Sequence, residues 1–356
     1  MNPGMDEQLL PDLLRLRGSV VAASDEFFGA KENLISPSEP VFTPEKYDAR
    51  GQVYDGWETR RRRGPGGTQP DPTHSDWVIV RLGVPGVVRA IVVDTAFFTG
   101  NFPQACSADA CSVPGYPSFS ELAADAAAGA GPWREIVPRA LLTGDARHAF
   151  KAGSGRRFTH VRLNIFPDGG VARLHVHGEA VPDPAMLEGL TIDLAALENG
   201  ADIVARSDQF YSSPRNVISP GLSRAMGEGW ETRRRRKPGY EWLVVRLAGR
   251  GVIDLAEIDT SWYRGNQPHS ASLQTMDAAD AAAADGSLAD ERAWRDLLPR
   301  VRLLPDTPHR FRVQGTAATH VRLNIYPDGG VARLRLYGSL TGDGLSALSR
   351  RWEETG

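Results

Sequence analysis

The feature that most constrains this chain is an internal duplication. The string Gly-Trp-Glu-Thr-Arg-Arg-Arg-Arg occurs at residues 56–63 and again at 229–236, and a sixteen-residue string recurs at 159–174 and 319–334 with one substitution. The copies keep the same order of motifs, and their separation falls from 173 to 160 residues between these strings, which places loop insertions in the first copy. Repeats of this length are whole domains and not solenoid units. We therefore expect two tandem domains with one fold.

The repeats divide the 356 residues into four parts. We expect a first repeat with an N-terminal extension over residues 1–180, a linker over 181–187, a second repeat over 188–340 and a C-terminal tail over 341–356. Each repeat is long enough to bury a core of its own, so no disulfide framework is needed. Both cysteines lie in the first copy, which argues against a disulfide or zinc site common to the two repeats.

Strand signals dominate each copy. Residues 76–82 and 241–247 are short runs rich in β-branched residues, each followed within two residues by a glycine and each leading to a second run that finishes at an Asp-Thr pair. Residues 161–165 alternate apolar and polar side chains, and the Pro-Asp-Gly-Gly that follows predicts a tight, hairpin-like reversal. Short strands separated by Gly and Pro indicate an all-β fold with an antiparallel sandwich in each half.

Bulk composition excludes several classes of function. The formal net charge is -3, which argues against a generally basic nucleic-acid-binding protein. No apolar stretch approaches the roughly 18 residues that indicate a membrane span, and the N-terminus does not resemble a signal peptide. The chain also lacks a peroxisomal Ser-Lys-Leu ending. We therefore expect no membrane or nucleic-acid partner and a cytoplasmic location.

The four arginines of each repeated string alternate between two faces if the segment is an extended strand. Arg60 and Arg62 then share one face with Glu58, and the other two arginines share the opposite face with Thr59. Two arginines per copy could grip a carboxylate bidentately while the others pair with acids or meet water. The alternative is a solvated edge strand with surface ion pairs. The corresponding residues of the second copy are Glu231, Arg233 and Arg235.

An aspartate ends an apolar run in each copy, seven residues before an asparagine. The pairs are Asp94 with Asn101 and Asp259 with Asn266. A carboxylate at a strand end, close to an amide in the next loop, could accept an N–H group of a ligand or act as a base. The alternative is the capping of a turn, because Asp and Asn both satisfy backbone groups locally.

A polar row repeats on the strand that opens the longer shared string. His160, Arg162 and Asn164 fall on one face by the strand period of two, and apolar residues fall on the other. The row offers an acid or base, a carboxylate clamp and an amide. The alternative is the polar outer face of a half-buried strand. The second copy has the same row at His320, Arg322 and Asn324.

Several signatures of other chemistry do not occur in the sequence. The eight histidines show no HExxH or similar metal spacing, and there is no Walker loop, no GxGxxG string and no GxSxG string. Nucleotide binding and serine hydrolysis thus lose their usual signals. We name no metal ligands and expect no cofactor, with a divalent metal left open.

The repeated motifs resemble those of the allantoicase family. The resemblance rests on the two Gly-Trp-Glu-Thr-Arg-Arg-Arg strings, each followed by Asp-Trp or Glu-Trp, then by Asp-Thr, by Gly-Asn-x-Pro and by His-Val-Arg-Leu-Asn-Ile-x-Pro-Asp-Gly-Gly-Val-Ala-Arg-Leu. It covers the chain from about Ser24 to Gly338. The closing Val-Ala-Arg-Leu-Arg-Leu-Tyr-Gly is also similar to the end of discoidin-like and galactose-binding-like sandwiches. The resemblance therefore implies a jelly-roll β-sandwich in each half.

The resemblance implies a hydrolase that acts on C–N bonds of linear amidines and converts allantoate to ureidoglycolate and urea in purine degradation. It also suggests a homo-oligomer. Allantoate carries one carboxylate and two ureido groups on a central carbon. The carboxylate calls for arginine, the ureido N–H groups call for Asp, Glu or Asn acceptors, and the departing urea nitrogen calls for a proton.

The residue types in the repeated motifs suggest a first hypothesis for the mechanism. Arginines of the run, together with Arg162 or Arg322, would hold the carboxylate. An acid would activate water, and His160 or His320 would protonate the leaving nitrogen. The candidate acids are Glu58, Asp94, Glu231 and Asp259, and the further candidates for substrate binding are Arg60, Arg62, Arg233, Arg235, Asn101, Asn164, Asn266 and Asn324.

Two other functions fit parts of the sequence. A tandem sandwich could be a non-enzymatic ligand-binding module, because this fold does not by itself imply catalysis. The arginine runs could instead bind a polyanion, which predicts a steep loss of affinity with salt. An assay of urea release from allantoate separates these alternatives.

Overall fold

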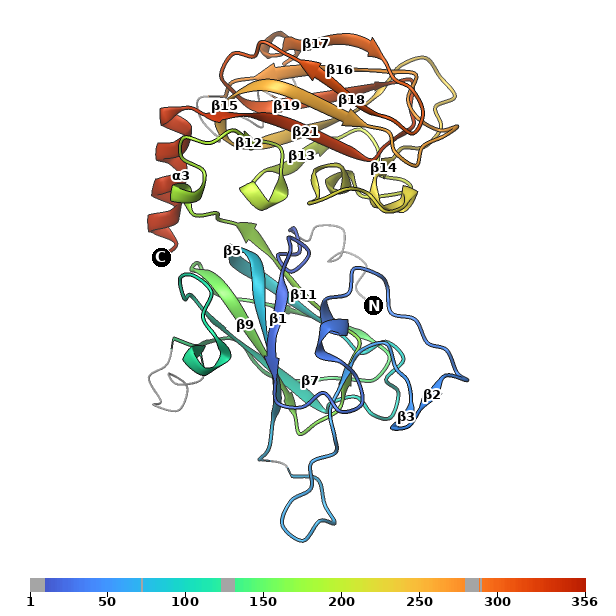
Figure 1. Ribbon diagram of the computed structural model, residues 1–356, viewed down its shortest axis with the longest axis vertical. Helices are drawn as coiled ribbons and strands as arrows, with labels where there is room; N and C mark the ends of the chain where they lie inside the picture. Colours follow the sequence, from blue (N-terminus) through green and yellow to red (C-terminus); the bar gives the residue numbers. More distant parts are fainter. Residues whose placement is uncertain (1–9, 72, 123–131, 279–287, 289) are drawn as a thin grey trace. The chain divides into compact units, whose positions relative to one another are not determined.

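The computed structural model describes residues 10–71, 73–122, 132–278, 288 and 290–356, which form two compact units (Figure 1). Unit 1 ends at Ala180 and also includes the last two residues of the chain, and unit 2 runs from Val181 to Glu354. Every strand pairing in both units is antiparallel. The expected all-β fold with a sandwich in each half is confirmed.

Unit 1 is organised around one long strand, β5 (Asp76–Asp94). Its first half pairs with β1 (Ser19–Ala23) and β9 (Arg157–Phe166), and its second half pairs with β8 (Arg147–Lys151) and β11 (Arg173–Ala180). One strand therefore takes part in both layers of the sandwich. The other strands are β2 (Tyr47–Asp48), β3 (Gly51–Gln52), β4 (Trp57–Glu58), β6 (Ala105–Cys111), β7 (Arg134–Leu141) and β10 (Gly170–Val171), and η2 (Lys31–Ile35) is a 3-10 helix.

Unit 2 repeats this arrangement around β15 (Glu241–Asp259), which pairs with β13 and β19 through its first half and with β18 and β21 through its second. Its strands are β12 (Ile192–Asp193), β13 (Asp202–Arg206), β14 (Trp230–Glu231), β16 (Ser270–Met276), β17 (Arg295–Arg302), β18 (Pro308–Arg312), β19 (Ala318–Tyr326), β20 (Gly330–Val331) and β21 (Arg333–Leu340). Its 3-10 helices are η3 (Pro184–Met186), η4 (Leu197–Asn199), η5 (Pro214–Ile218), η6 (Met226–Glu228) and η7 (Glu291–Ala293). Residues 342–354, in the segment expected to be a tail, form helix α3 (Gly342–Glu354).

The two short strands expected at residues 76–94 are one continuous strand, β5. The glycines that suggested a break instead allow other chain segments to come close. A Cβ on Gly83 would lie 1.8 Å from the carbonyl oxygen of Leu16, and a Cβ on Gly86 would lie 2.6 Å from that of Glu179. The pairing of β5 with β9 shifts register between Arg81 and Gly86, where the strand passes from one layer to the other.

The prediction of a hairpin at the Pro-Asp-Gly-Gly string is wrong. The strands on either side of it, β9 and β11, do not pair with each other, because β9 pairs with β5 and β6 while β11 pairs with the other half of β5. Within the turn, Gly169 has a φ of 136°, a conformation that glycine adopts readily. The turn carries the chain from one layer of the sandwich to the other, and unit 2 repeats it at Gly329, with a φ of 134°.

No helix among the described residues is long and apolar enough to cross a membrane.

Candidate functional site

The repeated string is first of all a structural anchor. Trp57 is fully buried and donates its indole N–H to the carbonyl oxygen of Asp25 at 2.7 Å. Gly56 precedes it because a Cβ there would lie 2.6 Å from the carbonyl oxygen of Val171. Unit 2 anchors the string in the same way at Gly229 and Trp230. This explains the Gly-Trp of the string by close packing and leaves the residues after it for chemistry.

The glutamate of each string is held by the asparagine of the Gly-Asn motif. The Asn101 amide donates to a carboxylate oxygen of Glu58 at 2.8 Å, and the Asn266 amide donates to Glu231 at 2.7 Å. Burial raises the pKa of Glu58 above its ordinary value. The structure thus brings together two residue types that the sequence analysis selected separately.

The aspartate of the Pro-Asp-Gly-Gly turn is a candidate site residue that was not among those selected from the sequence. The Asp168 carboxylate accepts the backbone N–H of Arg62 at 2.6 Å, and Asp328 accepts the backbone N–H of Arg235 at 2.8 Å. The threonine hydroxyl of each string also accepts a backbone N–H from this turn, that of Gly169 or Gly329. The turn and the arginine run are therefore fixed against each other. The repetition of Pro-Asp-Gly-Gly in both copies was the signal that could have revealed this role.

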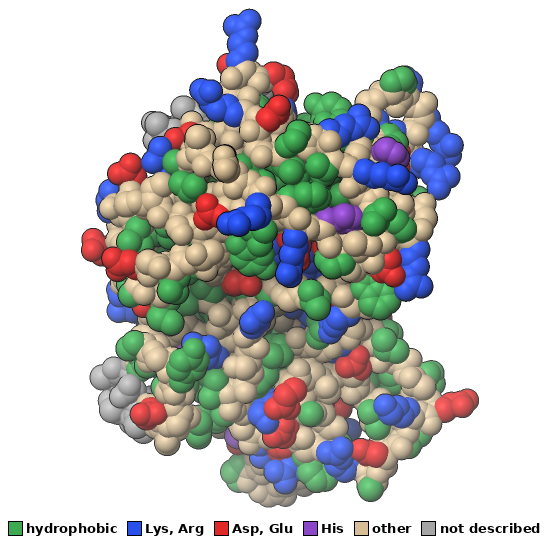
Figure 2. Space-filling model, turned by 45° about the horizontal axis from the view of Figure 1, so that its top comes forward, with side chains coloured by type: hydrophobic (Ala, Val, Ile, Leu, Met, Phe, Trp, Pro, Cys, Tyr) green, Lys and Arg blue, Asp and Glu red, His purple; other side chains and the backbone are tan. Residues whose placement is uncertain are grey.

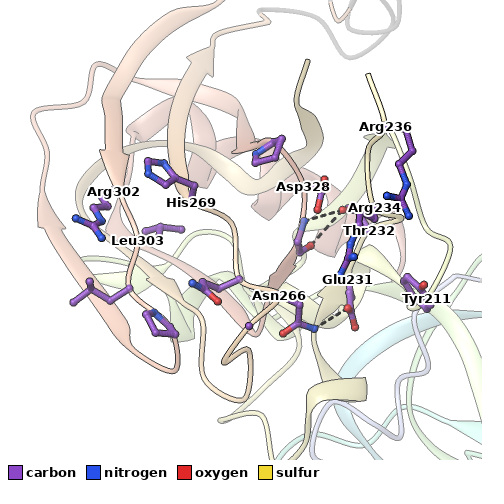
Figure 3. Close-up of a pocket in the computed structure, with 16 residues that line it drawn as sticks. Tyr211, Glu231, Thr232, Arg234, Arg236, Asn266, His269, Arg302, Leu303 and Asp328 are labelled. Carbon is purple, nitrogen blue, oxygen red and sulfur yellow. Dashed lines mark hydrogen bonds between the residues drawn. The ribbon is translucent and has the colours of Figure 1, made fainter. Parts of the chain in front are cut away.

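A pocket of about 660 Å³ opens beside this arrangement in unit 2 (Figure 3). His269, Arg302 and Leu303 lie along one side of the pocket, Glu231 and Arg234 lie on the other, and Asn266 and Asp328 lie between the two sides. The remaining lining residues are Tyr211, Thr232, Arg236, Gly265, Gln267, Leu304, Pro305, Pro327 and Gly329.

The charge of this pocket is suited to an anion. Arg234, Arg236 and Arg302 line it with exposed side chains, and among the described residues none of the three is paired with a carboxylate. Two carboxylates, Glu231 and Asp328, face the same space, and both already accept hydrogen bonds from the protein. The unpaired guanidinium groups favour a ligand that carries a carboxylate, since arginine binds this group through two parallel N–H donors.

The arginines selected from the sequence point to other partners. Arg62 pairs with Asp76 at 2.8 Å, and Arg60 pairs with Asp25 at 2.7 Å. In unit 2, Arg235 pairs with Glu241 at 2.5 Å. Arg233 stacks on an aromatic ring, and its Cζ lies 4.4 Å from the ring centre of Phe210. In unit 2, the pocket is therefore lined by Arg234 and Arg236, and not by Arg233 and Arg235, which were selected from the sequence for substrate binding.

The aspartates at the ends of the long strands act as caps. Asp94 accepts the backbone N–H of Ala96 at 2.8 Å, and Asp259 accepts the N–H and the hydroxyl of Ser261 at 2.8 Å and 2.6 Å. Both carboxylates are buried, and burial raises the pKa of Asp94. Asp259 does not line the unit 2 pocket. These contacts support the alternative of turn capping.

The histidines at the start of β9 and β19 do not suit the role of proton donor. Burial lowers the pKa of His160 and of His320 to about 4, so both are neutral near pH 7. Strand β19 ends at Tyr326, next to the pocket, and His320 lies six residues before that end. Six residues of strand span ~20 Å, so its imidazole lies far from the pocket.

The other residues of the polar row bond to neighbouring side chains, although the buried Oδ1 of Asn324 has no hydrogen-bond partner among the described residues. Arg162 pairs with Asp109 at 2.9 Å, and Arg322 pairs with Glu291 at 2.6 Å. The amide of Asn164 donates to Asp109 at 2.8 Å. In unit 2, Asn324 donates to Ser272 and Gln274 at 3.2 Å and 3.1 Å. This network stabilises one face of the sheet and argues against a direct role in substrate binding.

The described residues offer no specific support for metal binding or for polyanion binding. Among the described residues, no group of three or more His, Cys, Asp or Glu side chains is close enough to hold a metal ion. On the face drawn in Figure 2, Lys and Arg side chains are interspersed with Asp and Glu side chains.

Comparison with known proteins gives one consistent result. The family model described as "Allantoicase repeat" matches residues 12–181 and 192–341. The chain is 49% identical to a probable allantoicase of Streptomyces coelicolor, over 96% of this chain and 88% of that protein, and 39% identical to the allantoicase of Dictyostelium discoideum, over 94% and 87%. Its structure resembles the crystal structure of allantoicase from Saccharomyces cerevisiae, with a TM-score of 0.73, 33% identity and 92% of each chain covered.

Proposed function

As a member of the allantoicase family, this chain hydrolyses allantoate to ureidoglycolate and urea, and we propose that it does so in the pocket of unit 2. The family membership favours this hydrolase over a non-enzymatic binding module. One observation carries the choice of site. Three guanidinium groups without an ion-pair partner among the described residues share a pocket of about 660 Å³ with two oriented carboxylates.

The substrate carboxylate binds to the basic residues of the pocket. Arg234 and Arg236 are two residues apart in the irregular segment that follows β14, and Arg302 is the last residue of β17. A guanidinium group forms two parallel hydrogen bonds with a carboxylate, which fixes its position as well as its charge. In this proposal the central carbon of allantoate lies between the two walls of the pocket, and its ureido groups point toward Glu231 and Asp328.

Hydrolysis breaks the bond between the central carbon and one ureido nitrogen, and the same carbon forms a bond to the oxygen of water. The water gives up one proton and the departing urea nitrogen gains one, so the atoms balance. Glu231 is our candidate for the base that accepts the proton from water. The hydrogen bond from Asn266 at 2.7 Å holds its carboxylate in position for that transfer.

His269 is our candidate for the acid that protonates the departing nitrogen. It lies on the wall opposite Glu231 (Figure 3), and its side chain is exposed to the pocket. Imidazole is the side chain that most readily exchanges a proton near neutral pH. An acid and a base on opposite sides of the central carbon can act on the nitrogen and the water in the same reaction.

Substitution of two neighbouring arginines, one that lines the pocket and one that does not, tests this site. We expect Arg234→Ala to lower kcat/KM for urea release about 10- to 100-fold, because a hydrogen bond to a charged group contributes about 1.5–3 kcal/mol. Arg233→Ala removes a guanidinium that stacks on Phe210 and does not line the pocket, and we expect less than about a threefold change. Equal losses in the two variants would reject the assignment of faces.

Substitution of the two proton-transfer residues tests the chemical roles. We expect Glu231→Gln and His269→Gln to lower kcat by about 100-fold each, the size typical of lost general acid or base catalysis, with a smaller change in KM. Urea release by each purified variant is the measurement, with circular dichroism as a check on folding. Near-normal kcat in both folded variants, or loss of activity only on changing Glu58, would place the reaction elsewhere.

A homo-oligomer stays a prediction from the family resemblance, and a cytoplasmic location stays a prediction from the sequence. Size-exclusion chromatography with light scattering, and localisation of the tagged chain, would measure them.

A further inference from the structure

Unit 1 keeps the polar framework of the proposed site. Asn101 orients Glu58 as Asn266 orients Glu231, at 2.8 Å and 2.7 Å. The carbonyl oxygen of the same asparagine accepts a backbone N–H from the Pro-Asp-Gly-Gly turn at 2.7 Å in unit 1 and 2.8 Å in unit 2. Asp168 has the same hydrogen bond to the arginine run as its counterpart. The two glutamates therefore stand in closely similar surroundings.

Positive charge also remains in unit 1. Arg61 and Arg63 correspond to Arg234 and Arg236, their side chains are exposed, and neither forms an ion pair among the described residues. Burial raises the pKa of Glu58 and of Asp168, and the nearby Arg61 guanidinium only partly offsets this effect. The positive charge of Arg61 therefore influences both carboxylates. A site that binds a ligand carboxylate next to Glu58 and Asp168 needs a cation in this position.

The groups that differ are those on the opposite wall. Gln104 occupies the place of His269, because its backbone N–H bonds to Phe166 at 3.0 Å as that of His269 bonds to Tyr326 at 2.9 Å. Leu141 ends β7 where Arg302 ends β17. An amide in unit 1 thus replaces the imidazole of His269, and an alkyl group replaces the guanidinium of Arg302.

Phe102 replaces Gln267 and makes this wall more apolar. A Cβ on Gly144 would lie 2.7 Å from Cδ1 of Phe102, so the ring packs closely against the backbone at the position of Pro305 in unit 2. The unit 1 site thus keeps its carboxylate-binding and hydrogen-bond-accepting side and loses the side that would supply a proton.

We propose that unit 1 holds a second binding site, which takes small carboxylates bearing a ureido group and does not hydrolyse them. This inference rests on the proposed function, because it uses the unit 2 pocket as its template. Arg61 and Arg63 bind the carboxylate, and Glu58 and Asp168 accept ureido N–H groups. The amide of Gln104 can donate a hydrogen bond but exchanges no proton near neutral pH, so the ligand stays intact.

Binding stoichiometry tests the second site. The probe is radiolabelled N-carbamoylglycine, which carries one carboxylate and one ureido group, and equilibrium dialysis against the full chain measures moles bound at saturation. We expect two per chain for the native protein, one for Arg61→Ala, one for Arg234→Ala and none for the double variant. Arg89→Ala, which removes an exposed guanidinium paired with Glu179 in unit 1, is the matched control and should bind two.

The outcomes separate this inference from the proposed function. A native stoichiometry of one that Arg234→Ala abolishes and Arg61→Ala retains overturns the second site and leaves the unit 2 site standing. A stoichiometry of one that only Arg61→Ala abolishes overturns the unit 2 site, and with it the claim that the unit 1 site is a second site that does not hydrolyse its ligand. Two equivalents that Arg61→Ala leaves unchanged also overturn the second site. Circular dichroism of each variant, supplemented by Glu58→Gln if Arg61→Ala does not fold, keeps the test decisive.

Discussion

Arg62 and its counterpart Arg235 neutralise buried carboxylates, and this structural role has a measurable pH dependence. Burial opposes ionisation of Asp76, but hydrogen bonds from Arg62 and Ser24 outweigh it and hold the pKa of Asp76 below its ordinary value of 3.8. A depressed folded-state pKa contributes stability at pH values above the unfolded pKa, and this contribution is lost as pH falls below about 4. Asp76 has no exposed surface, so the loss of its partner leaves a buried charge.

We therefore expect Arg62→Ala to lower the free energy of unfolding at pH 7 by about 1–3 kcal/mol, because a buried acceptor loses its charged donor. The loss should be smaller at pH 3, because the stability that the ionised Asp76 contributes is lost as pH falls below about 4. Arg60→Ala is the matched control: its guanidinium is 59% exposed and its partner Asp25 also contacts Arg62, so we expect a change of less than about 1 kcal/mol. Urea unfolding at both pH values measures this, and a pH-independent loss would refute the ion-pair explanation.

At the scale of elements, the sequence predicts what is local and misses what depends on distant partners. Period-two alternation and the duplicated strings predict the sandwich. In unit 2, Arg234 and Arg236 line the pocket while Arg233 and Arg235 do not, although the arginine run lies outside β14. The choice of face is not local, because Asp328 meets the arginine run from 93 residues away. The hairpin failed for the same reason: a Pro-Asp-Gly-Gly turn has the same local chemistry whether its strands pair with each other or with separate halves of β5.

This turn gives a prediction of its own, because glycine there leaves room for an aromatic ring. A Cβ on Gly330 would lie 1.9 Å from Cε1 of Tyr263, and the backbone N–H of Gly330 also holds Asn266. We expect Gly330→Ala to cost about 1–3 kcal/mol of stability through overpacking, and to lower urea release because Asn266 orients Glu231. Gly227→Ala, with no atom within 4 Å of its Cβ, is the control. Thermal melting and the urea assay together decide, and native-like values for Gly330→Ala would contradict the packing argument.

In the molecule as a whole, duplication supplied two copies of one polar framework, and we propose that the residues on the opposite wall decide which copy reacts. That claim can be tested by transfer. In an Arg234→Ala background, we expect Gln104→His with Leu141→Arg to raise urea release at least about tenfold above that background, since it adds to unit 1 the proton donor and third guanidinium of unit 2. The same pair with Arg61→Ala added is the control, because it removes the carboxylate contact of unit 1. A graft that binds N-carbamoylglycine but releases urea no faster than the Arg234→Ala background would reject His269 and Arg302 as the groups that separate the two units.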